Sequence, residues 1–508
     1  MRARISLPLK IKMTLTIFPD QTYKGNLKKN LLLLIAEALG YELTNKSHQL
    51  EITNKIYKLS FSSHVLERFY ISSVHTIYFR LTALIQNHNI FKASYFTYFW
   101  PIHTKFALVN NKITLAKKKG YQTLMLGKWH LGFGKNNEYL PTNFGFDEFF
   151  GLPYTHHGRI CFPNNSTCES KEGNATIENN PCPLFSDTTI VQQPVYLPEV
   201  TGHYAERAKN FIKSSQASGK PFFLYLPFDH VHMPQFSGEN FYLSSPRGQI
   251  GDAISELDWA VGQVLQAIKD AGAQENTIVW FSSDNGPAME FHQHGGSAGL
   301  LRCAKGTTFD GGIRVPSIVT WPGTIKPGKS NALTSNMDML PTLAAIAGIS
   351  TSNLTLDGLD ITSVLMDPDI KGPREFFASY NQDPDQSEGP FTVHHGQYKA
   401  HYWTKGDKLA DNSNYDPMCG ESHALTRHDP PLLFDLYQDP GERYNLAGLP
   451  EYQNELKIIE EWRNQHMASV TWMPPRTQLA DPSITLCCKP GCEPFPSCCR
   501  CNNIPYTQ

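Results

Sequence analysis

Three short apolar runs, each followed at once by polar side chains, constrain the fold of this chain more than any other feature of its sequence. They are residues 123–126, 222–226 and 277–281. Continuous apolar runs bounded by glycine or proline are typical of strands buried on both faces, as in a parallel sheet covered by helices. Because ligands bind beyond the carboxyl ends of such strands, the polar residues that follow the runs are candidates for a functional site.

Helical patterns separate these runs. Residues 205–214 predict a helix directly before the run at 222–226. A second helix is expected after Gly251, with Asp252 as its N-cap and Gly272 as its stop, because an apolar stripe lies between them. Alternating strands and helices predict an α/β fold with a mixed or parallel sheet flanked by helices. The stripe consists of Ile254, Leu257, Val261, Val264, Leu265 and Ile268.

The pattern changes from about residue 371. Residues 391–403 and 432–436 predict short strands, and residues 451–466 predict a helix, so we expect a smaller C-terminal α+β domain over 371–508. A short tail rich in proline and glycine buries little apolar surface, which favours disulfides as its crosslinks. A tetrahedral zinc site is the alternative. The tail contains Cys487, Cys488, Cys492, Cys498, Cys499 and Cys501.

The first 111 residues differ from the rest in composition. Residues 1–110 carry 14 Lys and Arg against 5 Asp and Glu, whereas the remaining 398 carry 31 against 42. The basic residues are scattered among apolar ones, which argues against a nucleic-acid surface. The run 31–36 is too short for a membrane span and, broken by Glu37, makes no convincing export signal. We expect a few helices here, such as 29–39, and assign no fold to 1–111.

Cysteines and glycosylation sequons nevertheless predict passage through an oxidising, secretory compartment. The chain has 11 cysteines, and clusters of cysteine are typical of proteins that form disulfides outside the cytosol. Sequons of the form Asn-x-Ser/Thr are glycosylation candidates. They lie at Asn164, Asn165, Asn174 and Asn353.

The polar cluster after the third apolar run has the chemistry of a metal site. Asp284 and Asn285 precede Gly286, and carboxylate and amide oxygens are ligands that Ca²⁺ and Mg²⁺ accept. An ordinary Asx turn is the alternative for this sequence.

Lysines and histidines in the other clusters suit an oxyanion. Lys128 and His130 alternate, so on an extended segment both would project to the same side, and His230 and His232 repeat this alternation. A lysine supplies a compact positive charge and a histidine can accept or donate a proton. Lys305 lies in a glycine-flanked loop that lacks the Walker spacing. The alternatives are surface lysines and histidines packed in the core.

Taken together, these clusters resemble the sulfatase family. The motifs occur in the family's order over roughly residues 112–508, and the cysteine-rich tail is most similar to the arylsulfatases. They are Gly-Lys-Trp-His at 127–130, His-x-His-x-Pro-Gln-Phe-Ser-Gly at 230–238, Ser-Asp-Asn-Gly at 283–286, Gly-Leu-Leu-Arg-Cys-Ala-Lys-Gly-Thr-Thr at 299–308, Phe-Asp-Gly-Gly-Ile-Arg-Val-Pro at 309–316 and Asp-Met-Leu-Pro-Thr at 338–342.

The resemblance implies an alkaline-phosphatase-like α/β fold, with a core domain over 112–370, in a lysosomal or secreted protein that hydrolyses sulfate esters. It implies a sulfated small molecule or glycolipid as substrate and allows a homo-oligomer. Asp284 and Asn285 would be ligands of calcium, or of magnesium as in some members. Cys303 and Cys419 would form a long-range disulfide.

The same resemblance assigns the remaining site residues. Lys128 and Lys305 would bind sulfate oxygens, and His130 would hold the nucleophile. His232 would face the leaving oxygen as proton donor. Thr155 stands where the family has a serine in the substrate pocket.

Two parts of the family's equipment have no match in this sequence. The family's nucleophile is a formylglycine made from the cysteine of Cys-x-Pro-Ser-Arg, and neither this motif nor its serine version occurs here. The family's N-terminal Asp pair is also missing, since Asp20 is the only aspartate before Asp147. We therefore expect a weakly held metal and impaired or absent hydrolysis. The alternative is a non-catalytic protein that binds sulfated ligands or partners.

Overall fold

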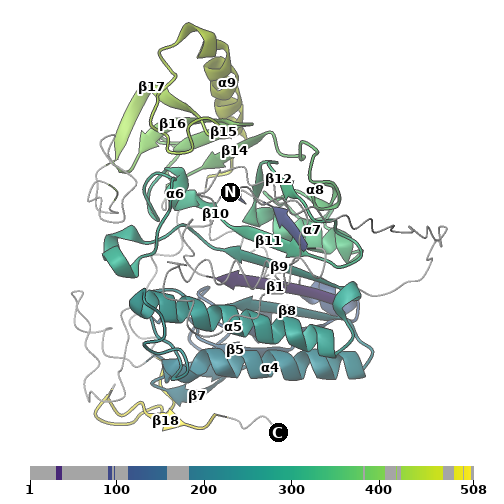
Figure 1. Ribbon diagram of the computed structural model, residues 1–508. Helices are drawn as coiled ribbons and strands as arrows, with labels where there is room; N and C mark the ends of the chain where they lie inside the picture. The colour runs from purple at the N-terminus through teal and green to yellow at the C-terminus, as the bar shows by residue number, and fades with distance from the viewer. Residues whose placement is uncertain are drawn as a thin grey trace, which may run out of the picture.

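The computed structural model describes residues 30–36, 90–93, 96–97, 113–156, 182–381, 384–406, 419, 425–472, 486–495 and 497–504. A large twisted sheet with helices on both faces forms the main body, and a smaller domain lies beyond one of its edges (Figure 1). None of the helices described is both long enough and apolar enough to span a bilayer.

The large sheet has the strand order β12-β2-β11-β9-β1-β8-β4-β5-β6-β7-β18. Its centre, from β9 to β5, is parallel, and antiparallel strands flank it on both sides. The three apolar runs of the sequence are β4, β8 and β9, so the predicted parallel strands are confirmed. The strands are β1 (Asn30–Ala36), β2 (Ile90–Ala93), β4 (Gln122–Leu126), β5 (Glu148–Gly151), β6 (Leu184–Ser186), β7 (Thr189–Gln193), β8 (Phe222–Pro227), β9 (Thr277–Ser283), β11 (Ser317–Thr320), β12 (Lys329–Ser330) and β18 (Cys501–Asn502).

Strand β1 corrects the prediction of a helix over residues 29–39. It lies in the middle of the sheet, where Leu32 pairs in parallel with Leu224 of β8 and with Val279 of β9. Leu31, Leu32 and Leu33 are all buried, because a strand with neighbours on both sides and helices over both faces has no polar face. The apolar run 31–35 followed by Glu37 has the same form as the other three runs, and that form is the signal for this strand.

Helices α4 (Leu197–Ala217) and α5 (Gly248–Asp270) pack against each other and cover one face of the sheet (Figure 1). The helix predicted over 205–214 lies inside α4. The predicted N-cap at Asp252 is wrong, since α5 begins at Gly248. The Asp252 carboxylate instead accepts hydrogen bonds from the amides of Leu243, Ser244 and Ser245, and so holds the preceding loop.

The other face of the sheet is covered by shorter elements. Alternate residues of the strands belong to this second core, among them Met125, Phe223 and Trp280, which cluster with residues of α7 and α8. A three-stranded sheet of β10, β3 and β13 lies beside it. The elements are α3 (Ile113–Lys118), α6 (Asp310–Ile313), α7 (Met339–Ile346), α8 (Thr362–Met366), β3 (Phe96–Thr97), β10 (Arg314–Val315) and β13 (Thr334–Ser335). Short 3-10 helices span Pro141–Phe144, Gln274–Asn276, Met289–His294 and Asn336–Asp338.

The C-terminal domain is an antiparallel sheet covered by one helix, which confirms the predicted smaller α+β unit. Strands β14 (Phe376–Ser379), β15 (Thr392–His395), β16 (Tyr398–Thr404) and β17 (Thr426–Asp435) pair in sequence order, and α9 (Gln453–Ser469) packs on them after a 3-10 turn at Pro450–Tyr452. The segment 391–403 forms two strands rather than one, because Gly396, with φ of 56°, turns the chain between them.

The cysteine-rich tail returns to the main body and pairs with its far edge (Figure 1). Its strand β18 pairs antiparallel with β7. The tail cysteines form three disulfides, Cys487–Cys499, Cys488–Cys501 and Cys492–Cys498. The sulfurs of Cys487, Cys492 and Cys499 lie within 4.8 Å of one another, yet each belongs to a disulfide. The structure thus supports the disulfides and not the zinc alternative.

Candidate active site

The carboxyl ends of four neighbouring parallel strands, β9, β1, β8 and β4, form one edge of the large sheet. The residues predicted to contact the metal, the sulfate or the nucleophile follow one of these strands within six residues, except for Thr155 and Lys305. β1 ends at Ala36, opposite Ser283 of β9, so the chain also leaves β1 at this edge. The following residues, 37–89, lie outside the described part.

Lys128 and His130 follow β4 in a loop that the backbone fixes. The amide of Lys128 donates to Pro227 O of β8 at 2.9 Å, and that of His130 donates to Pro153 O at 3.1 Å. Gly127 has φ of +107°, and a Cβ there would lie 1.9 Å from Pro227 O, so only glycine fits. Lys128 is buried and His130 is exposed. The predicted extended backbone does not continue to His130, whose φ is 57°.

Thr155 follows β5 and is half-buried. Its neighbour His156, which the sequence reasoning gave no role, is buried, and its ring centroid lies 5.7 Å from that of His232. The His156 Nε2 atom donates to Pro234 O at 3.1 Å. His156 therefore ties the loop after β5 to the loop after β8. The only signal in the sequence is its place directly after Thr155.

The two alternating histidines after β8 differ in their surroundings. His230 is buried, and its Nε2 atom lies 2.9 Å from Glu256 Oε2 of α5 and 3.0 Å from Thr201 Oγ1 of α4. His230 is therefore the histidine that is packed in the core. His232 is half-buried, and its Nδ1 atom donates to Met233 O at 2.6 Å.

Asp284 and Asn285 follow β9 in a turn with defined polar contacts. The main-chain amide of Asn285 donates to Asp284 Oδ1 at 2.9 Å. An Asx turn would use the amide two residues along, so the turn is of another kind. Asn285 Nδ2 donates to Gly286 O at 2.9 Å, and this contact does not use its Oδ1 atom. A carboxylate and an amide oxygen fit a hard divalent cation.

The described residues supply only part of a metal-binding set at this turn. Asp284 belongs to no described group of three or more His, Cys, Asp or Glu side chains whose ligand atoms lie within 4.8 Å of one another. A calcium ion needs six to eight oxygen ligands. Asp284 and Asn285 would therefore supply only part of the shell that such an ion requires.

Lys305 lies in a loop, residues 302–312, that we call the lysine loop. Its amide donates to Pro287 O at 2.9 Å, and the Gly286 amide donates to Gly312 O at 2.9 Å. Two hydrogen bonds thus join the lysine loop to the turn that carries Asp284 and Asn285. A Cβ on Gly286 would lie 1.9 Å from Gly311 O, so the two segments approach closely. Cys303 of the loop forms a disulfide with Cys419.

Comparison with known proteins decides the family. The Sulfatase family model matches residues 29–349, and the model of the C-terminal region of aryl-sulfatase matches residues 372–501. The chain belongs to the sulfatase family. The match begins before β1, so it includes the central strand as well as the motifs from residue 127 onward.

Curated relatives cover nearly the whole sulfatase chain. Arylsulfatase A of Bos taurus is 39% identical over 487 residues, which are 93% of this chain and 95% of that protein. Arylsulfatase A of Homo sapiens is 38% identical over the same share of each. Among solved structures, PsFucS1 sulfatase from Pseudoalteromonas sp. is similar with a TM-score of 0.68 at 22% identity, over 87% of this chain and 90% of that one. The predicted alkaline-phosphatase-like fold class agrees with these similarities.

Of the glycosylation candidates, Asn353 lies within the described residues. Asn353 is exposed in a loop after α7. Asn164, Asn165 and Asn174 lie outside the described residues.

Proposed function

We propose that this sulfatase binds sulfate monoesters at the carboxyl edge of its central sheet, and that its hydrolysis of them is impaired. The observation that carries the binding proposal is the pair of hydrogen bonds that joins the lysine loop to the Asp284–Asn285 turn. A cation held at the turn and a lysine on the loop would meet the same oxyanion. Such preorganised positive groups stabilise a multiply charged oxyanion without further rearrangement.

Each site residue has a role in this proposal. Asp284 and Asn285 would hold Ca²⁺ or Mg²⁺, which would supply positive charge to neutralise that on the sulfate oxygens. Lys128 and Lys305 hold the other sulfate oxygens. His232 has its Nδ1 proton engaged with Met233 O, so it exchanges a proton with the leaving oxygen through Nε2. His130 lies at the position that faces the nucleophile in the family, and Thr155 lines the pocket.

The proposed impairment follows from the sequence. Without Cys-x-Pro-Ser-Arg the chain encodes no formylglycine precursor, and loss of a covalent nucleophile lowers the rate by orders of magnitude while binding persists. A sulfated small molecule or glycolipid is the ligand class, and a lysosomal or secreted location agrees with the disulfides. Calcium, glycosylation and a homo-oligomer belong to the same proposal.

Two measurements on the purified chain test it. Isothermal titration calorimetry with 4-nitrophenyl sulfate should show saturable binding. Lys128→Ala and Lys305→Ala should each weaken this binding by about tenfold, because each substitution removes a charged hydrogen bond. Release of 4-nitrophenol at acidic pH should be undetectable over many hours. Absence of binding would overturn the binding site, and ready turnover would overturn the impairment. Saturable binding without turnover is the result expected both of an impaired hydrolase and of the non-catalytic alternative.

A further inference from the structure

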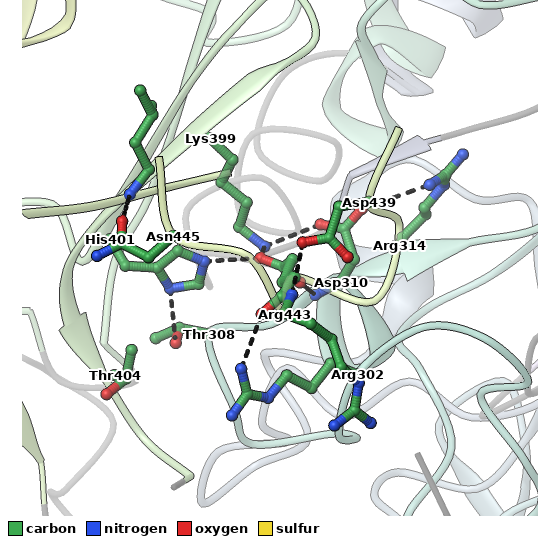
Figure 2. Close-up of polar contacts among 12 residues, drawn as sticks. Arg302, Thr308, Asp310, Arg314, Lys399, His401, Thr404, Asp439, Arg443 and Asn445 are labelled. Carbon is green, nitrogen blue, oxygen red and sulfur yellow. Dashed lines mark hydrogen bonds and ion pairs between the residues drawn. The ribbon is translucent and has the colours of Figure 1, made fainter. Parts of the chain in front are cut away.

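A buried cluster of charges joins the C-terminal domain to the lysine loop (Figure 2). Lys399 of β16 is completely buried. Its Nζ atom lies 2.8 Å from Asp310 Oδ1 in the lysine loop and 2.9 Å from Glu442 Oε1, which follows β17. Arg314 Nη1 lies 3.5 Å from the other oxygen of Asp310. The proposed sulfate site uses none of these residues directly.

Glu442 contacts both ends of the lysine loop. Its Oε2 atom accepts the amide of Asp310 at 2.6 Å, and its main-chain oxygen accepts Arg302 Nη1 at 2.8 Å. The Gly311 amide donates to Arg302 O at 2.8 Å, which closes the loop between these two anchors. One residue of the C-terminal domain therefore holds the two positions that flank Lys305.

The other side of the lysine loop is hydrogen-bonded to the Asp284–Asn285 turn. The Lys305 amide donates to Pro287 O, and the Gly286 amide donates to Gly312 O. The loop thus lies between two partners, the C-terminal domain and the turn. Displacing either partner would move the loop, since the loop is short and closed on itself.

The charges of this cluster explain why it fixes the position of the lysine loop relative to the C-terminal domain, rather than simply joining the two. Burial alone would raise the pKa of Asp310, but Lys399 and Arg314 hold that pKa well below its usual value. Two further buried groups, His394 and His401, have lowered pKa values because burial and Lys399 oppose their protonation. Apolar side chains would join the two surfaces at lower desolvation cost. Charged hydrogen bonds instead impose distance and direction on each partner.

We propose that Lys399 and Glu442 are positioning residues that hold Lys305 in register with the Asp284–Asn285 turn, so that the C-terminal domain is part of the sulfate site. This inference rests on the proposed function for the role of Lys305. It adds that substrate binding depends on residues of a second domain that do not contact the substrate.

The test is a double-mutant cycle between Glu442→Gln and Lys305→Ala, with Glu455→Gln as matched control. Glu442 Oε1 lies 2.7 Å from His401 Nε2, and Glu455 likewise pairs with a histidine, since its Oε1 atom lies 2.5 Å from His395 Nδ1 in the same domain. In the described contacts, Glu455 touches no part of the lysine loop. Titration with 4-nitrophenyl sulfate should show that Glu442→Gln weakens binding about tenfold and Glu455→Gln less than about twofold.

The cycle separates positioning from mere stability. In the Glu442→Gln background, Lys305→Ala should weaken binding by less than about twofold, because a lysine that is no longer positioned contributes little to binding. In the Glu455→Gln background it should keep its full effect. Full additivity with Glu442→Gln would overturn the inference. Circular dichroism must show that Glu442→Gln and Glu455→Gln are both folded. If Glu442→Gln is not folded, the triple variant Asp310→Asn/Lys399→Met/Glu442→Gln, in which all three side chains are uncharged, takes its place.

Hydrogen exchange keeps the test independent of the proposed function. If the unaltered chain binds no sulfate ester, the proposed function fails, and exchange at the Lys305 amide still decides the inference. Faster exchange in Glu442→Gln than in Glu455→Gln would support positioning of the loop. Equal exchange in the two variants would overturn it.

Discussion

Replacing Leu32 by alanine tests the assignment of β1 to the centre of the sheet. Leu32 is fully buried, pairs with β8 and β9, and packs in the same core cluster as residues of α4 and α5. The substitution removes three carbon atoms. At about 0.8 kcal/mol for each, the lost transfer free energy is about 2.4 kcal/mol, and the cavity that remains adds to it. We expect a loss of about 3 to 4 kcal/mol in the free energy of unfolding, within the range for buried leucines.

Urea unfolding followed by tryptophan fluorescence measures this loss, because Trp280 of β9 lies in the same sheet. Leu243→Ala is the matched control, since Leu243 is 75% exposed. It should change the free energy of unfolding by less than about 0.5 kcal/mol. If Leu32→Ala had as small an effect as Leu243→Ala, the placement of β1 in the sheet would be refuted.

Two further predictions concern the Lys128 loop and the C-terminal domain. Gly127→Ala should displace Lys128 and weaken binding of 4-nitrophenyl sulfate by at least about tenfold, because its Cβ would overlap Pro227 O. Gly132→Ala is the control with a similar positive φ and open space, and equal binding by the two variants would contradict the steric argument. Burial lowers the pKa of His394 from 6.5 to about 3, so on acidification the unfolded state binds its proton first, and stability present above pH 6.5 falls progressively toward pH 3. Urea unfolding at about pH 7 and about pH 4 measures this loss in the free energy of unfolding, and the loss should be smaller in His394→Asn than in the unaltered chain. An equal loss in the two proteins would contradict the role of His394.

The parallel strands could be predicted because their residues carry the signal locally. In β4, β8 and β9 every residue or nearly every one is buried, so the whole run is apolar. β1 has the same pattern, but it lies in a segment with weak turn signals and few glycines, where nothing marks the ends of a strand. The N-cap assigned to Asp252 failed because a carboxylate near a helix start can bond equally well to a neighbouring loop.

The candidate site was predictable in its parts but not in its connections. Lys128, Asp284 and Lys305 lie in recognisable motifs, and the order of parallel strands brings the first two to one edge. The contact between Glu442 and Asp310 joins residues 132 positions apart. Neither residue belongs to a local pattern that predicts a buried charge, and only the packing of the two domains brings them together. His156 was missed because its contact with Pro234, 78 positions away, is likewise not signalled by any local pattern.

The pairing of β18 with β7 has a consequence for how the molecule behaves in solution. An uncovered edge strand offers unpaired amides and carbonyls to any other chain, and such edges promote association. Here the last described strand of the chain covers that edge, and three disulfides fix the fold of the segment that carries it. Reducing these three disulfides would release the segment and uncover β7. Self-association is therefore the defect to expect when the tail is reduced.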